Sequence, residues 1–252
     1  LGMDYTGTVA MGTGIQYEAL YIWNEEGTIV GDGTAAGRNL ISGNNNAGVV
    51  VYSSTGMGGT VIKGNIIGLQ KDGMSYVAGN TQLTGLRVQD SPRTIIGGSG
   101  PADQNIISGN GKAATSNTYG ISITDASGNS VIKGNYIGLC ADGATAPSPN
   151  QTVGFYYSVN GSSTIGGTLA GEGNVISGQG VDATYSGAGI LRSGYASSSF
   201  LYGNIIGLQA DGMSLVPGNF QDNGIYTSVA NWVIGNGAAS GRNIISGNNT
   251  YG

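Results

Sequence analysis

The sequence contains no histidine, and Cys140 is its only cysteine. Without histidine, the chain cannot form a serine–histidine–aspartate triad, a histidine general base or a histidine metal ligand. A single cysteine excludes an internal disulfide bond and a zinc site built from several thiolates. Several common classes of enzyme and metal site are therefore excluded at the outset.

Charged residues and long apolar runs are also scarce. Asp, Glu, Lys and Arg make up 9% of the chain and the net charge is −5, whereas charged residues are about 25% of an average protein. The few basic residues form no stripe of the kind that binds nucleic acid. No apolar run reaches the length of about 18 residues needed for a membrane-spanning helix. We therefore expect no nucleic-acid partner and no membrane span.

The start of the chain and its composition bear on where the protein works. No basic segment precedes an apolar one near Leu1, so we expect no signal peptide in this sequence. The absence of an initiator Met suggests a processed or excised piece. An acidic chain that is poor in cysteine and rich in Gly, Asn, Ser and Thr favours an extracellular or cell-surface location.

Glycine is abundant, with 49 residues of 252, as it also is in collagen and in disordered chains. The glycines show no three-residue period, which excludes a collagen helix. Fourteen tyrosines, two tryptophans and recurrent Ile and Val argue against disorder. The chain is therefore expected to fold.

An internal repeat organises the whole chain. The string Asn-Ile-Ile-Ser-Gly-Asn, with small variations, begins at residues 39, 105, 174 and 243, which are 66, 69 and 69 residues apart. A related string, Gly-Asn-x-Ile-Gly-Leu, begins at residues 64, 134 and 203. The two strings alternate, so each 69-residue unit divides into two similar halves and the chain holds seven such halves.

Each half is expected to form three short strands, one for each of its three apolar segments. These segments are a Gly followed by alternating apolar residues, an aliphatic pair, and the Ile-rich string. Three short strands cannot bury their apolar faces alone, but coils stacked on one another form a continuous interior. We predict an all-β fold: a parallel β-helix, or solenoid, of about seven three-strand coils. It forms a single domain over residues 1–252, with a 69-residue two-coil repeat and almost no helix.

Aligned halves share one asparagine in the same place. An inward asparagine at a turn can hydrogen-bond the matching asparagine above and below, which avoids burying unsatisfied polar groups at a cost of about 1–3 kcal/mol each. Ligand binding by these side chains is the alternative. The predicted structural ladder consists of Asn39, Asn65, Asn105, Asn135, Asn174, Asn204 and Asn243.

The repeated strings resemble the right-handed parallel β-helix repeats of large secreted bacterial proteins, within the wider pectin-lyase-like superfamily, and the resemblance covers the whole chain. It implies a right-handed coil, but little about activity, because this fold carries lyases, hydrolases, adhesins and phage spikes. The lyases use clustered carboxylates for calcium with an Arg or Lys base, and the hydrolases use clustered aspartates with a histidine. Here histidine is missing, and Glu25 and Glu26, in a predicted turn, are the only acids at short spacing.

We therefore expect a non-catalytic, extracellular structural or adhesive module of a bacterial surface protein or filament. The alternative is a pectin-lyase-like carbohydrate-active enzyme or a carbohydrate-binding module. Three equivalent loops carry Asp-Gly, at Asp72, Asp142 and Asp211. Asp-Gly is first a turn signal; calcium binding is the alternative, although a calcium site needs six to eight oxygen ligands. We expect no other cofactor.

Several outward positions of the first strand carry large side chains, which suggests contact with glycans or with another protein, whereas simple β-propensity is the alternative. These residues are Tyr21, Trp23, Tyr52, Arg87, Tyr156 and Tyr226. Arg192 falls at a nominally inward position, so either its strand ends early or the alignment slips. Cys140 aligns with Gln70 and Gln209 and is expected on a loop surface as a free thiol, with intermolecular cross-linking as a functional alternative.

Neither end of the repeat array shows a capping segment. An open end coil leaves backbone groups unpaired and provides a template for further strands. We therefore expect either that the chain continues in the native protein or that separate chains associate end to end, a contact that produces filaments.

Overall fold

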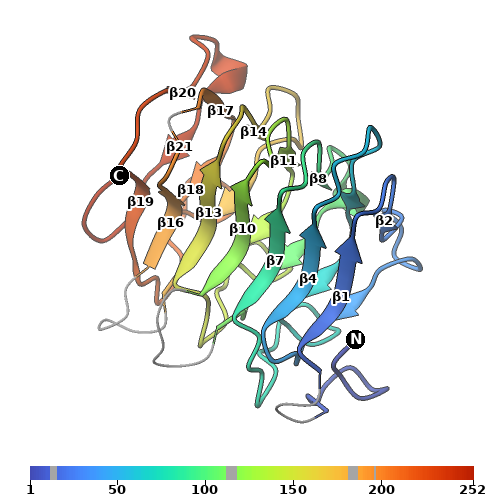
Figure 1. The fold of residues 1–252 in the computed structure, drawn as a ribbon. Coiled ribbons are helices and arrows are strands. Elements are labelled where there is room, and N and C mark those ends of the chain that lie inside the picture. Colours follow the sequence, from blue (N-terminus) through green and yellow to red (C-terminus); the bar gives the residue numbers. More distant parts are fainter. Residues whose placement is uncertain (12–15, 112–117, 181–186, 196) are drawn as a thin grey trace.

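The computed structural model describes residues 1–11, 16–111, 118–180, 187–195 and 197–252. The strands form three parallel sheets of seven strands each, and every coil contributes one strand to each sheet. Figure 1 shows the strands of successive coils side by side along the solenoid. Helix in the described residues is confined to two three-residue 3₁₀ turns, Pro101–Asp103 and Ala239–Gly241. The predicted all-β parallel β-helix is confirmed.

The first sheet contains the longest strands, and its register is regular apart from one shift between Gly187 and Ala188, where β16 pairs with β19. Tyr21 pairs with Val50, Val50 with Arg87, and the same column continues through Ser122 and Tyr156. Equivalent residues therefore stack directly above one another. The strands are β1 (Glu18–Trp23), β4 (Ala47–Tyr52), β7 (Thr84–Gln89), β10 (Tyr119–Asp125), β13 (Val153–Val159), β16 (Gly187–Arg192) and β19 (Gln221–Thr227).

The second and third sheets are built from strands of two to four residues. The second sheet comprises β2 (Ile29–Val30), β5 (Val61–Ile62), β8 (Ile95–Gly97), β11 (Val131–Lys133), β14 (Thr164–Gly166), β17 (Ser199–Tyr202) and β20 (Trp232–Ile234). The third comprises β3 (Leu40–Ile41), β6 (Ile66–Ile67), β9 (Ile106–Ile107), β12 (Tyr136–Ile137), β15 (Val175–Ile176), β18 (Ile205–Ile206) and β21 (Ile244–Ile245).

The interior is one apolar column that runs through the coils. In the short strands, the second residue of each aliphatic pair points inward: Ile96 and Ile132 from the second sheet and Ile137 from the third are fully buried. They belong to a single core cluster together with inward residues of the first sheet. Burial of such side chains contributes about 25 cal/mol per Å² of apolar surface removed from water. Each coil thus depends on its neighbours to complete its core.

Glycine forms the corner after the second sheet. Gly97 has a φ of +85°, and a Cβ at this position would lie 2.0 Å from the carbonyl oxygen of Lys133 in the next coil. Gly31 and Gly166 occupy equivalent corners with the same geometry. The coil can turn and stack this tightly only without a side chain, which accounts for part of the unusual glycine content.

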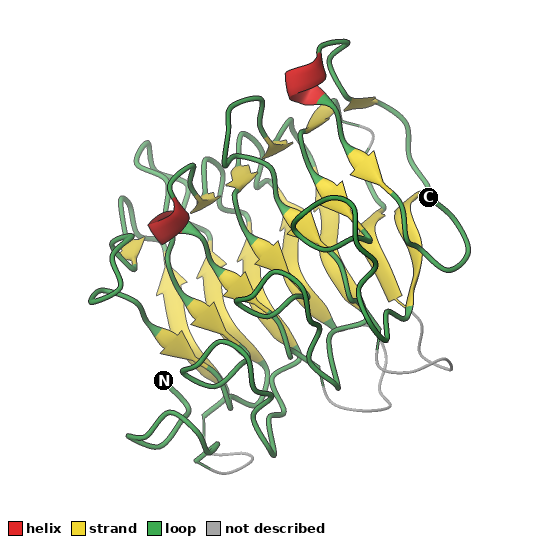
Figure 2. Ribbon diagram, turned by 180° about the vertical axis from the view of Figure 1, so that it is seen from behind, coloured by secondary structure: helices red, strands yellow, loops and turns green. Residues whose placement is uncertain are grey.

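The loops that follow the third strand in alternate coils also stack on one another. Lys71 N donates to Gly7 O at 3.1 Å, Ala141 N to Gly73 O at 2.8 Å, and Ala210 N to Gly143 O at 2.8 Å. Figure 2, which views the molecule from behind, shows such loops running along the length of the solenoid. They form an additional layer against the outer face of the third sheet. No helix of the described residues is long and apolar enough to cross a membrane.

Candidate functional surfaces

The repeated asparagines form a continuous hydrogen-bonded ladder. Asn105 Nδ2 donates to Asn135 Oδ1 at 2.8 Å, and Asn135 Nδ2 donates to Asn174 Oδ1 at 3.0 Å. The same link joins every successive pair from Asn39 to Asn243, always in the same direction along the solenoid. Each inner amide also donates to a backbone carbonyl, as Asn135 does to Ile96 O. The ladder side chains are therefore occupied by contacts between coils.

A second polar column lies at the next corner and was not predicted. Asn44 Nδ2 donates to Gln82 Oε1 at 2.7 Å, and Gln82 Nε2 donates to Asn110 Oδ1. All three side chains are buried. The sequence signal was the last residue of the Asn-Ile-Ile-Ser-Gly-Asn string, which is an amide residue in all four copies: Asn44, Asn110, Gln179 and Asn248. This column also stabilises the stacking of coils.

The Asp-Gly aspartates close their own loops. Asp72 Oδ1 accepts hydrogen bonds from Met74 N and Ser75 N, and Oδ2 accepts one from Ser75 Oγ at 2.7 Å. Asp142 and Asp211 make the corresponding bonds. The Ser214 hydroxyl and the amides of Ser214 and Met213 lower the pKa of Asp211. Both carboxylate oxygens are thus engaged within the turn.

Metal-ligating side chains do not gather elsewhere in the described ranges, where no group of three or more Asp, Glu, His or Cys residues could hold a metal ion. The remaining acids serve other contacts. Lys63 pairs with Asp103 at 3.0 Å and Lys133 with Glu172 at 2.7 Å, so each pair ties a loop to the end of a second-sheet strand. Glu25 lies in an exposed turn, as does Glu26.

The outer face of the first sheet carries exposed aromatic rings. Trp23 is 65% exposed, Tyr21 54% and Tyr226 53%, whereas Tyr52 and Tyr156 are half-buried. We call this surface the tyrosine face; it consists of Tyr21, Trp23, Tyr52, Arg87, Tyr119, Tyr156 and Tyr226.

The rings of the tyrosine face occur in pairs. The centroids of Tyr21 and Tyr52 are 6.5 Å apart, and those of Tyr119 and Tyr156 are 5.1 Å apart. Tyr119 was not among the predicted contact residues. Arg87 lies on β7, between the two pairs in strand order. Such rings offer apolar area together with a polar hydroxyl, which suits them to binding surfaces.

The side chain of Arg192 does point inward and is fully buried. Its strand continues to Arg192 in register, where Arg192 pairs with Tyr157 on one side and Thr227 on the other. Its guanidinium lies over the rings of Tyr157 and Trp232, at 5.8 and 5.1 Å from their centroids. The Nη2 group donates to the carbonyls of Tyr195 and Ser197, while Nε and Nη1 have no hydrogen-bond partner among the residues that the structure describes. Burial lowers the pKa of Arg192. Aromatic partners, rather than an early strand end or a slipped alignment, accommodate the charge.

The expected surface position of Cys140 is wrong. Its side chain is only 2% exposed and packs with Ile66, Leu69 and Ile106 beneath the stacked loops. The thiol donates to Met74 O of the preceding loop at 3.3 Å. In the equivalent loops, Gln70 instead donates to a carbonyl of its own loop. Burial raises the pKa of the Cys140 thiol, so this cysteine is an interior packing residue.

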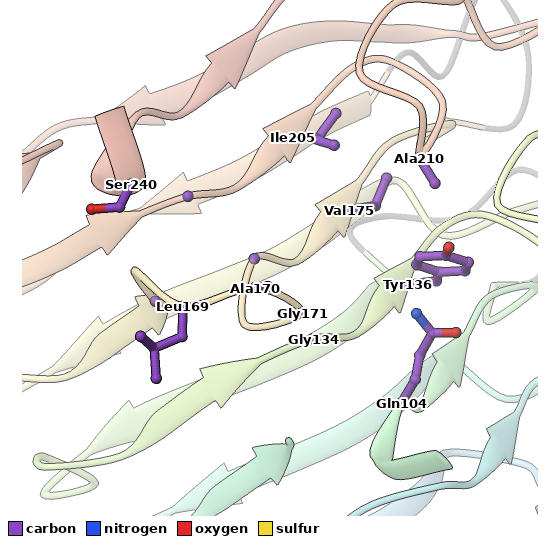
Figure 3. Close-up of a pocket in the computed structure, with 13 residues that line it drawn as sticks. Gln104, Gly134, Tyr136, Leu169, Ala170, Gly171, Val175, Ile205, Ala210 and Ser240 are labelled. Atoms are coloured by element: carbon purple, nitrogen blue, oxygen red, sulfur yellow. The ribbon is translucent and has the colours of Figure 1, made fainter. Parts of the chain in front are cut away.

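A groove on the outer face of the third sheet was also not predicted from the sequence. It has a volume of about 370 Å³. Tyr136, Val175 and Ile205, from three consecutive strands, lie along it, and Gln104, Leu169 and Ser240 come from the loops that precede the third strand in alternate coils. Figure 3 shows Gln104 and Tyr136 toward one end of this third-sheet groove and Ser240 toward the other.

No protein-family model matches the chain, and searches of curated proteins and of solved structures gave no match.

Proposed function

We propose that the chain is a non-catalytic, extracellular structural or adhesive β-solenoid module of a bacterial surface protein or filament. The observation that supports this proposal most strongly is that the polar side chains mainly form hydrogen bonds and ion pairs between stacked coils. Two buried polar columns and the loop ion pairs join one coil to the next, and the stacked loops join alternate coils. Seven coils at about 4.8 Å each make a rigid rod roughly 30 Å long.

The ends of the asparagine ladder support association along the axis. At one end, Asn39 Oδ1 accepts no hydrogen bond from the described residues; at the other, the Asn243 backbone N–H donates none within them. The free acceptor and the free donor are complementary in direction. We propose that a coil of a second molecule extends the ladder. Sedimentation of the 252-residue chain tests this association: concentration-dependent linear oligomers are expected, and a monomer at all concentrations contradicts it.

The tyrosine face supports an adhesive role, because three of its rings are more than half exposed on a flat, rigid sheet. The alternative function is a pectin-lyase-like carbohydrate-active enzyme or carbohydrate-binding module, and the third-sheet groove favours its binding form.

A cleavage screen separates the proposed non-catalytic function from the enzymatic form of the alternative. The chain is incubated with acidic and neutral polysaccharides, with and without calcium, and new chain ends are quantified. The structural proposal predicts no product above a heat-denatured control. Cleavage that disappears when one loop carboxylate is changed, for example in Glu172→Gln, would overturn it.

A further inference from the structure

The third-sheet groove exists because two sets of loops leave a strip of the sheet between them. On one side, loops that follow the third strand cover part of the outer face, and Ala210 belongs to this set. On the other side stand the loops that precede the third strand, with Leu169 exposed in the middle one. The three strands along the strip span two coil steps, about 10 Å. The strip is therefore elongated along the solenoid axis.

The lining of the groove is apolar below and polar at its ends. Tyr136 supplies an aromatic ring and Val175 and Ile205 supply aliphatic surface. The Gln104 amide, the Tyr136 hydroxyl and the Ser240 hydroxyl have no hydrogen-bond partner among the described residues. This combination provides both a donor and an acceptor at Gln104 and a hydroxyl at either end. Unused polar groups beside an apolar floor are typical of small-molecule sites.

Charge and shape narrow the ligand class. Among the described residues, no Asp, Glu, Lys or Arg lines the groove, and the nearby Lys133 and Glu172 neutralise each other. Five glycines contribute to the lining, and at Gly173 a Cβ would lie 2.0 Å from Gly203 O, so part of the wall is bare backbone. The volume falls within the range of about 300–1,000 Å³ seen for ligand sites.

We propose that the third-sheet groove binds a short stretch of a neutral glycan. A pyranose ring presents an apolar C–H face, which matches the Tyr136 ring and the aliphatic floor, and a rim of hydroxyls, which matches the free amide and hydroxyl groups. The absence of lining charge disfavours acidic sugars, because their carboxylates would meet no cation there. This inference rests on the proposed adhesive function and assigns it a ligand class and a place separate from the tyrosine face.

Isothermal titration with cellohexaose, xylohexaose and mannohexaose tests the inference, with hexagalacturonate as the acidic probe. At least one neutral hexasaccharide is expected to bind. For that probe, Tyr136→Ala and Gln104→Ala should each weaken binding about tenfold, the equivalent of 1.4 kcal/mol, while Tyr136→Phe retains most of it. Ala170→Trp fills the groove from an exposed loop position without removing a core contact, and should also weaken binding at least about tenfold.

Tyr5→Ala, at an exposed tyrosine outside both the groove and the tyrosine face, is the matched control and should bind like the parent chain. The inference is overturned if no neutral hexasaccharide binds at millimolar concentration, if hexagalacturonate binds more tightly, or if binding is lost in Tyr21→Ala on the tyrosine face but kept in Ala170→Trp. A proline-rich peptide that competes better than any sugar would also overturn it. Chain ends are counted in the same samples: cleavage there contradicts the non-catalytic function, whereas loss of binding alone contradicts only the glycan assignment.

Discussion

Asn135 lies near the middle of the asparagine ladder and is fully buried. Its Oδ1 accepts from Asn105 Nδ2 at 2.8 Å, and its Nδ2 donates to Asn174 Oδ1 at 3.0 Å and to Ile96 O at 2.9 Å. Asn135 Nδ2 also donates to Lys133 O at 3.0 Å, and Oδ1 also accepts from Asn105 N at 3.4 Å. Asn135→Ala therefore removes five side-chain hydrogen bonds and deprives buried polar groups of Asn105, Ile96 and Asn174 of a partner. Each such group costs about 1–3 kcal/mol. We expect the free energy of unfolding to fall by about 3–5 kcal/mol.

Asn39→Ala is the matched control for Asn135→Ala, because Asn39 is half-exposed and its side chain bonds to only one neighbour in the ladder. Water can reach the groups left behind, so a loss of about 1 kcal/mol or less is expected. Urea unfolding followed by far-ultraviolet circular dichroism and tyrosine fluorescence provides both values. A loss below about 1 kcal/mol for Asn135→Ala, or equal losses for the two variants, would refute the ladder as a stabilising element.

Three further experiments test the loops and the interior. Hydrogen bonds from Thr6 and from the Val9 and Thr8 amides lower the pKa of Asp4 from 3.8 to about 2, and the pKa values of Asp72, Asp142 and Asp211 are also lowered. Stability from these carboxylates is complete above the unfolded pKa and is lost as the pH falls through the folded pKa. The melting temperature of the parent chain should therefore fall between pH 4 and pH 2. The melting temperature of a variant with all four aspartates changed to Asn should fall less over the same range, and an equal fall in both would contradict a stabilising role of these carboxylates. Cys140 should react with a thiol reagent at least about tenfold more slowly in the folded chain than in urea, since burial hides the thiolate; equal rates would place it on the surface after all. Arg192→Met removes a buried charge that has no carboxylate partner among the described residues but keeps its bulk, so the urea midpoint should stay the same or rise, and a loss above about 3 kcal/mol would show that the aromatic contacts outweigh desolvation.

The fold was predictable because its determinants recur at fixed spacing. Ile67, Ile137 and their equivalents mark the third strand in every half-repeat, and parallel stacking follows once equivalent strands must share a core. The place of the asparagine column at a corner follows from the same alignment. A register repeated along the whole chain leaves few alternatives to compete with it.

The misplaced and missed residues depend on contacts between segments distant in sequence. Alignment placed Cys140 correctly in a loop, but gave no sign that this loop folds back onto Ile66 and Ile106. Arg192 breaks the apolar pattern, and its partner Trp232 lies one coil further along. The third-sheet groove draws its lining from several coils, and its one local signal is the tyrosine at position 136, where the equivalent strings have Ile66 and Ile205.

Hydrogen exchange of the asparagine side-chain amides tests the central claim most directly, because the rod exists only if each coil is hydrogen-bonded to the next. Nuclear magnetic resonance of the chain labelled at asparagine side chains reports each amide separately. The account predicts that the Nδ2 groups of Asn65, Asn105, Asn135, Asn174 and Asn204 exchange far more slowly than that of the exposed Asn249. Exchange of these inner amides as fast as that of Asn249 would contradict it.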